Sequence, residues 1–94
     1  MADGTVEIDF GSDPAVEASV LVSSGLSGLT AATHKEAFVQ GDSTTTDNDA
    51  DSHKQFAISA KLSCEFVSAT SMRIYATLMK DLATGKFLLH WVTK

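Results

Sequence analysis

The sequence contains few cysteines, which form covalent cross-links, and few basic residues, which form nucleic-acid-binding surfaces. Its 94 residues include one cysteine, one proline and only seven lysine and arginine residues. One cysteine excludes a disulfide within the chain, and the three histidines match no zinc-ligand spacing. Twelve aspartate and glutamate residues give a net charge of −5, which repels phosphate and disfavours nucleic acid or anionic lipid as a partner. No secretory leader is predicted, because Met1–Gly4 carries neither a basic nor an apolar leader region, and no apolar run approaches the ~20 residues of a membrane helix.

Two-residue alternation of apolar and polar side chains is the dominant pattern. The longest run predicts one strand in which Phe56, Ile58, Leu62 and Phe66 share a buried face, with a bend or bulge along its length. Helix signals are few. Strands are predicted over residues 5–10, 16–22, 34–40, 55–66, 72–78 and 86–93.

The connecting segments are rich in small and polar residues. Residues 11–14 and 68–71 are predicted to reverse the chain, and residues 80–85 to form a hairpin turn. The 23–33 stretch is predicted to be a loop that places Leu26 and Leu29 in the core, and the 41–52 stretch an exposed loop. Val16 is expected to face inward. The pattern as a whole predicts an all-β fold over 1–94, a single-domain antiparallel β-sandwich of six to seven strands, either jelly-roll or immunoglobulin-like.

Three aspartates in the 42–51 segment have the spacing of the first ligands of a calcium loop. Asp47, Asp49 and Asp51 stand at i, i+2 and i+4, but the glycine and glutamate that an EF-hand requires are replaced by Ser52 and Ile58. A solvated polar loop is the favoured interpretation. Whether this loop binds a cation stays open at this stage, and no metal ligand, catalytic residue or cofactor is predicted.

The remaining reactive side chains also have structural interpretations. His34 and His53 flank the acidic loop and could meet across a hairpin, where Asp51 could pair with one of them at a subunit contact. Cys64 alternates with apolar residues, so it is predicted to be buried with a raised pKa, which makes it a poor nucleophile.

The last strand carries apolar side chains on both faces. One face is predicted to pack in the core and the other to contact a partner chain. The residues predicted to form this subunit interface are Leu88, His90 and Val92, with Asp51 and His53 beside them.

Short motifs along residues 16–93 resemble a family of small virion structural proteins of tailed bacteriophages. The motifs are Ala37-Phe38-Val39, a polar loop ending at Asp51-Ser52-His53, Arg73-Ile74-Tyr75-Ala76, and Gly85-Lys86-Phe87 followed by Trp91-Val92. The chain departs from the family pattern at Phe38, where tryptophan is commoner, and at Leu88-Leu89-His90. The resemblance implies a β-sandwich that acts in a capsid or tail without chemistry of its own.

The sequence therefore favours a non-enzymatic protein that decorates or cements a capsid shell through symmetric subunit contacts. It would be made in the host cytoplasm and reside in the virion as a homo-oligomer, with a trimer favoured, bound to the major capsid protein or other virion proteins. A tail fibre, tip or adaptor component is one alternative. A carbohydrate-binding module on the same sandwich, using Tyr75, is another.

Overall fold

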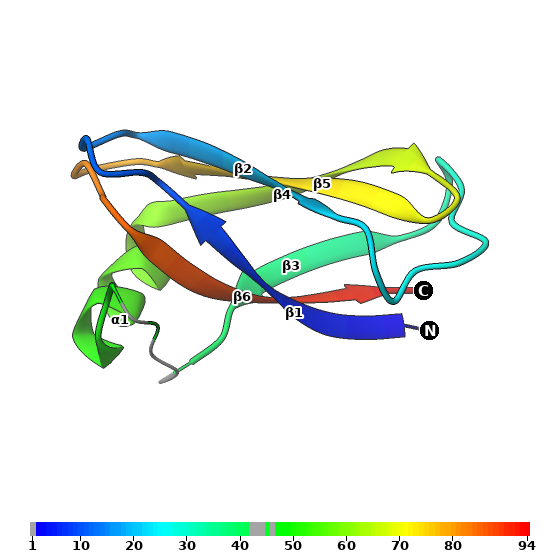
Figure 1. Cartoon of the computed structure of the whole chain (residues 1–94), viewed down its shortest axis with the longest axis horizontal. Helices are drawn as coiled ribbons and strands as arrows, with labels where there is room; N and C mark the ends of the chain where they lie inside the picture. The colour runs from blue at the N-terminus through cyan, green and yellow to red at the C-terminus, as the bar shows by residue number, and fades with distance from the viewer. Residues whose placement is uncertain (1, 42–44, 46) are drawn as a thin grey trace.

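The computed structural model describes residues 2–41, 45 and 47–94, and it shows two three-stranded antiparallel sheets packed face to face (Figure 1). The strand orders are β1–β6–β3 and β2–β5–β4. The predicted all-β sandwich is confirmed. Its elements are β1 (Ala2–Asp9), β2 (Glu17–Val22), β3 (Lys35–Val39), α1 (Ala50–Ser59), β4 (Ala60–Ser68), β5 (Ser71–Leu78) and β6 (Lys86–Thr93).

The chain crosses between the two sheets more often than predicted. β4 and β5 form a hairpin whose register shifts between Phe66 and Ser68, but β5 and β6 lie in different sheets. The prediction of a hairpin at 80–85 is therefore wrong. That segment runs beside the β1–β2 connection instead, where Ala15 and Ala83 form an isolated bridge and the Phe10 N–H donates to the Gly85 carbonyl at 2.9 Å.

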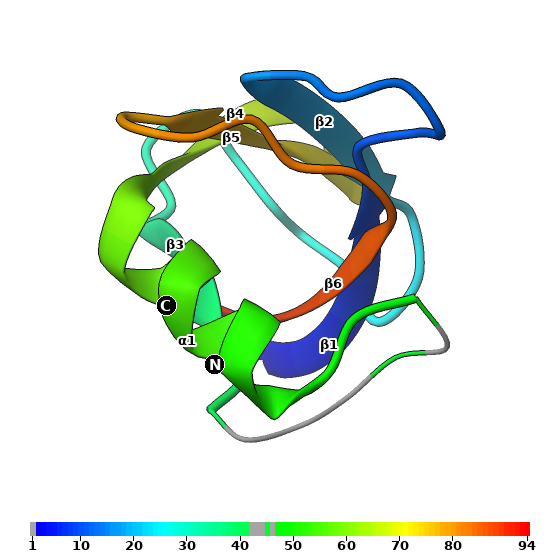
Figure 2. The same ribbon diagram turned by 90° about the vertical axis from the view of Figure 1, so that its left-hand side faces the viewer.

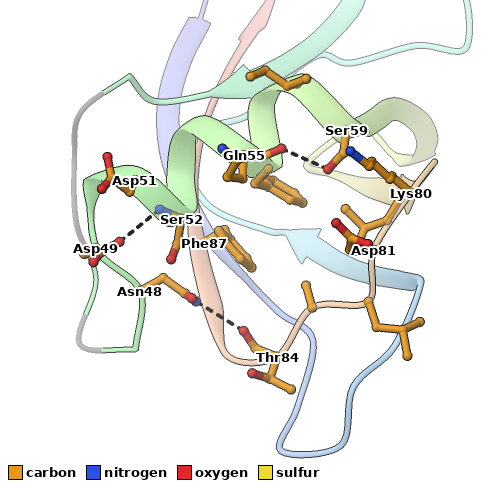
Figure 3. Close-up of a pocket in the computed structure, with 15 residues that line it drawn as sticks. Asn48, Asp49, Asp51, Ser52, Gln55, Ser59, Lys80, Asp81, Thr84 and Phe87 are labelled. Carbon is orange, nitrogen blue, oxygen red and sulfur yellow. Dashed lines mark hydrogen bonds between the residues drawn. The ribbon is translucent and has the colours of Figure 1, made fainter.

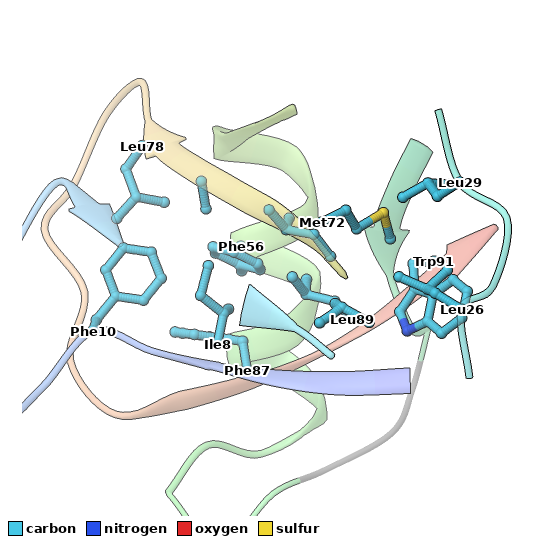
Figure 4. Packing of buried hydrophobic residues seen from close by; sticks show 13 residues of the cluster. Ile8, Phe10, Leu26, Leu29, Phe56, Met72, Leu78, Phe87, Leu89 and Trp91 are labelled. Atoms are coloured by element: carbon cyan, nitrogen blue, oxygen red, sulfur yellow. The ribbon is translucent and has the colours of Figure 1, made fainter. Parts of the chain in front are cut away.

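The core lies between the sheets (Figure 4). Leu26 and Leu29 are buried there as predicted, whereas Val16 is 41% exposed and the expectation that it faces inward is wrong. Trp91 packs directly over Gly4, where an added Cβ would lie 2.6 Å from Trp91 Cζ2, so no larger residue fits at that position. The buried apolar residues are Ile8, Phe10, Val22, Leu26, Leu29, Phe56, Met72, Ile74, Ala76, Leu78, Phe87, Leu89 and Trp91.

The main error of the sequence analysis concerns residues 50–66. The predicted strand over 55–66 is in fact the end of α1 followed by β4. The Asp49 carboxylate accepts a hydrogen bond from the Ser52 N–H at 2.9 Å, which caps the first turn of α1. The helix buries His53 and Phe56, a spacing of three that suits one helix face.

This helix separates side chains that one strand would have aligned. Ile58 is 80% exposed, and Phe66, near the far end of β4, is 36% exposed. Leu62 and Cys64 are partly buried against the core, as the alternation predicted for the β4 part of the segment. Within the described part of the chain, no helix combines the length and apolar character needed to cross a membrane.

Candidate functional site

The start of β6 continues beyond the end of β3, and side chains pair with its free edge. The Leu88 N–H donates to His53 Nε2 at 3.1 Å, and the Lys86 N–H donates to Asp47 Oδ2 at 3.2 Å. Asn48 Nδ2 donates to the Lys86 carbonyl at 2.8 Å, and Thr45 Oγ1 donates to the same oxygen at 2.9 Å. The side chains of Thr45, Asp47, Asn48 and His53 thus take the place of a strand along this edge, which would otherwise offer unpaired backbone groups to other chains.

Gly85 makes this approach possible. Its φ is +78°, and a Cβ built there would lie 2.8 Å from Asp47 Cβ and 3.0 Å from Asn48 Nδ2. A left-handed backbone and a close neighbour both require glycine at this position.

The three aspartates with calcium-loop spacing do not converge on one point. Asp47 binds the backbone of β6, Asp49 caps α1, and Asp51 lies exposed in the first turn of the helix. The N-cap hydrogen bond from Ser52 lowers the pKa of Asp49, so this carboxylate stays charged. No group of three potential metal ligands occurs among the residues that the structure describes. Residues 42–44 and 46 of the predicted loop lie outside that part.

His53 is an internal residue with both ring nitrogens occupied. Because Nε2 accepts from the Leu88 N–H, the proton lies on Nδ1, which donates to the Asp49 carbonyl at 3.0 Å. The ring is fully buried, with its centroid 5.5 Å from that of Phe87. The expectation of a contact between His53 and a partner subunit does not fit this burial.

His34 and Asp51 do not join His53 as the sequence suggested. The backbone of His34 pairs with Lys94, just after the end of β6, because the Lys94 N–H donates to the His34 carbonyl. His53 instead binds the Leu88 N–H near the start of β6, six residues before Lys94. At about 3.4 Å per residue this separation is roughly 20 Å. His34 Nε2 instead lies 3.3 Å from Glu36 Oε2. Asp51 forms no ion pair with a described residue.

The predicted interface residues on β6 do share one outward face. Leu88, His90 and Val92 alternate with buried neighbours and are all partly exposed. Phe38 of β3 stands opposite His90, with ring centroids 5.1 Å apart, and is 45% exposed. We call Phe38, Leu88, His90 and Val92 the apolar row. Phe38 was not among the predicted interface residues, although the same alternation that places Ala37 and Val39 inward turns it outward.

Carboxylates border the apolar row. Asp3 of β1 and Glu36 of β3 both stand opposite Val92, and Glu7 stands opposite Leu88. Asp3 Oδ2 lies 3.7 Å from His90 Nε2. The outer face of this sheet therefore combines an apolar centre with a negative border.

A cleft of about 480 Å³ opens between α1 and the 80–84 segment (Figure 3). Phe56, Leu78 and Phe87 form its apolar floor, and the rings of Phe56 and Phe87 stack with centroids 4.3 Å apart. Ile58 and Leu82 line its rim and are 80% and 58% exposed. This cleft was not predicted, because one of its walls is the helix α1, and a strand was predicted over most of that helix.

Asp49, Asp51 and Asp81 line the same cleft, together with the cation Lys80. In Figure 3 the first two stand on the helix side, while Asp81 comes from the opposite wall. The cleft therefore joins exposed apolar side chains to a net negative rim.

Two other predicted side chains lie away from both surfaces. Burial raises the pKa of the Cys64 thiol, with the nearby positive charge of Lys35 opposing the rise, so the predicted direction is confirmed. Tyr75 lies on the outer face of the β2–β5–β4 sheet, where its hydroxyl donates to Glu65 Oε1 at 3.2 Å.

The likeness to phage virion proteins stays a prediction from sequence motifs. No protein-family model, no curated protein and no solved structure matches this chain.

Proposed function

We propose that this chain is a non-enzymatic assembly protein that decorates or cements a virion shell. It associates with further copies of itself through the outer face of the β1–β6–β3 sheet. The observation that carries the proposal is the apolar row. Its side chains occupy outward positions, where an isolated antiparallel sheet normally presents polar residues to water.

The size of this face sets the strength of the contact. Two strands of eight residues and one of five cover about 340 Å², whereas a stable complex buries about 800 Å² on each partner. Self-association in dilute solution is therefore expected to be weak. A shell that holds many copies in register raises the local concentration and strengthens the contact by multivalency.

The border of carboxylates gives this contact a characteristic salt dependence. Symmetric copies bring Asp3, Glu7 and Glu36 toward equivalent residues of the neighbour. Like charges oppose association and are screened by salt, so sodium chloride is expected to strengthen self-association.

The test compares wild type with Val92→Asp by sedimentation equilibrium over a concentration series. The added charge lies on the apolar row, at its end nearest the C-terminus of β6. It is expected to weaken association at least about tenfold, because an unpaired charge would lose its hydration in the contact. Thr77→Asp is the matched control, since Thr77 is exposed on the outer face of the other sheet. Circular dichroism confirms that each variant is folded.

The proposal requires wild type and Thr77→Asp to associate equally and Val92→Asp to associate at least about tenfold more weakly. Wild type that stays monomeric to millimolar concentration contradicts self-association, and equal association of Val92→Asp contradicts the choice of face. Imaging of the parent particle tests the virion setting: density for the sandwich on the shell supports it, density on the tail favours the fibre or adaptor alternative, and absence from the particle contradicts both.

A further inference from the structure

We infer that the cleft between α1 and the 80–84 segment binds a partner protein through a peptide segment that combines aliphatic and basic side chains. This surface is separate from the apolar row. The inference does not rest on the self-association proposed above.

The apolar part of the cleft supplies the first argument. Its floor of Phe56, Leu78 and Phe87 is continuous with the core, so an inserted side chain would contact a packed and ordered surface. The volume of about 480 Å³ lies within the range of sites that bind small ligands or a few side chains.

Three aliphatic side chains near the rim are unusually exposed for a domain of this size. Ile58, Met79 and Leu82 are 80%, 78% and 58% exposed. Ile58 and Leu82 line the cleft, and the Met79 N–H donates to the Ser59 carbonyl at the end of α1. Clustered exposure of this kind is characteristic of a protein-binding surface, whereas single exposed apolar residues are ordinary.

Charge decides which segment fits. Asp49, Asp51 and Asp81 carry three negative charges on the rim against the one positive charge of Lys80. Asp51 and Asp81 form no ion pair with any residue in the described part of the chain. In Figure 3 the amine of Lys80 extends toward Ser59 rather than toward Asp51. A cationic segment would neutralise this rim, whereas phosphate or an acidic peptide would be repelled.

The test uses an acetylated octapeptide that alternates arginine and leucine, and a second peptide with glutamate in place of each arginine. Binding to the full chain is measured by isothermal titration and by ¹⁵N–¹H NMR. We expect the basic peptide to shift the amides of residues 49–58 and 79–84, and the acidic peptide to shift none of them. Raising the salt from about 0.02 M to about 0.5 M should weaken binding, because the Debye length falls from about 20 Å to about 4 Å.

Two substitutions separate the cleft from a general attraction to an acidic protein. Asp81→Lys is expected to weaken binding at least about tenfold, and Ile58→Ser about fivefold, since Ile58 is exposed and its loss leaves the fold intact. Glu65→Lys makes the same charge change on the outer face of β4, away from the cleft, and should leave binding within about twofold.

Equal weakening by Asp81→Lys and Glu65→Lys would mean nonspecific attraction and would overturn the inference. Shifts centred outside the two cleft segments, binding of the acidic peptide, or no binding of either peptide at low salt would also overturn it. The self-association test has an independent readout, because salt should strengthen that contact and weaken this one.

Discussion

At the scale of single residues, the side chains of Thr45, Asp47, Asn48 and His53 complete the edge of β6. His53 is the most constrained of them. It accepts from the Leu88 N–H, donates to the Asp49 carbonyl and packs against Phe87, all while fully buried. A histidine beside an acidic loop suggested a polar contact at a surface. The spacing of residues could not reveal that this ring accepts a hydrogen bond from β6, at a position where β3 no longer pairs with β6.

Replacing His53 should therefore cost stability. His53→Ala leaves a cavity and a buried N–H without an acceptor, and we expect it to reduce the free energy of unfolding by about 3 kcal/mol. His53→Phe retains a ring but not the acceptor and should cost about 1–2 kcal/mol. Urea unfolding followed by Trp91 fluorescence measures both.

His34→Ala is the control for these variants, because His34 is an exposed histidine whose side chain binds only Glu36 among the described residues. It should change the free energy of unfolding by no more than about 0.5 kcal/mol. If His53→Ala is no more costly than His34→Ala, the assignment of His53 to the β6 edge is wrong.

At the scale of elements, α1 departs from its sequence pattern because of a local cap and a tertiary contact. Residues 56–66 alternate without a break in the sequence, and β4 follows that alternation in its burial from Ala60 to Glu65. Before Ala60 the chain forms a helix, because Asp49 caps it and because a helix end at Ser59 lets the Ser59 carbonyl accept from the Met79 N–H. The apolar residues at 56 and 58 fit either element, and tertiary packing decides between them.

The cap of α1 should be visible in the acid stability of the domain. Because hydrogen bonding from Ser52 lowers the pKa of Asp49 in the folded state, its contribution is fully present above the unfolded pKa. That contribution is lost as the pH falls through the lower folded value. Asp49→Asn keeps a capping side chain without a titrating charge.

We therefore expect wild type to lose more stability than Asp49→Asn on acidification below about pH 4. Thermal unfolding followed by circular dichroism across this pH range measures the difference. Identical pH profiles would contradict the role of the charged cap.

The strands were predicted well where one face is buried and the other is exposed. β1, β2 and β5 follow their alternation, and Leu26 and Leu29 enter the core from a loop. Which strands share a sheet could not be predicted, because alternation gives a strand its faces but not its neighbours. The 80–85 segment shows this, since turn residues are equally suited to a hairpin and to a crossing between sheets.

At the scale of the whole molecule, the domain offers two distinct surfaces. The helix α1, which forms one wall of the cleft, lies at one end of the long axis, whereas the chain termini lie toward the other end (Figure 1). Figure 2 views the molecule from the end that carries α1. The apolar row covers the outer side of the β1–β6–β3 sheet. A protein with one surface for its own copies and another for a basic segment of a different chain would connect neighbouring subunits of an assembly. Of the residues in the apolar row, only Leu88, His90 and Val92 of β6 were predicted from the sequence.

The most direct test of the central claim follows the methyl groups of the two outer faces by ¹³C NMR as the protein concentration rises. The methyls of Leu88 and Val92 should shift progressively, and those of Leu21, which is 42% exposed on the outer face of the other sheet, should stay fixed. Shifts at Leu21 with Leu88 and Val92 unchanged would contradict the claim that this domain assembles through the β1–β6–β3 face.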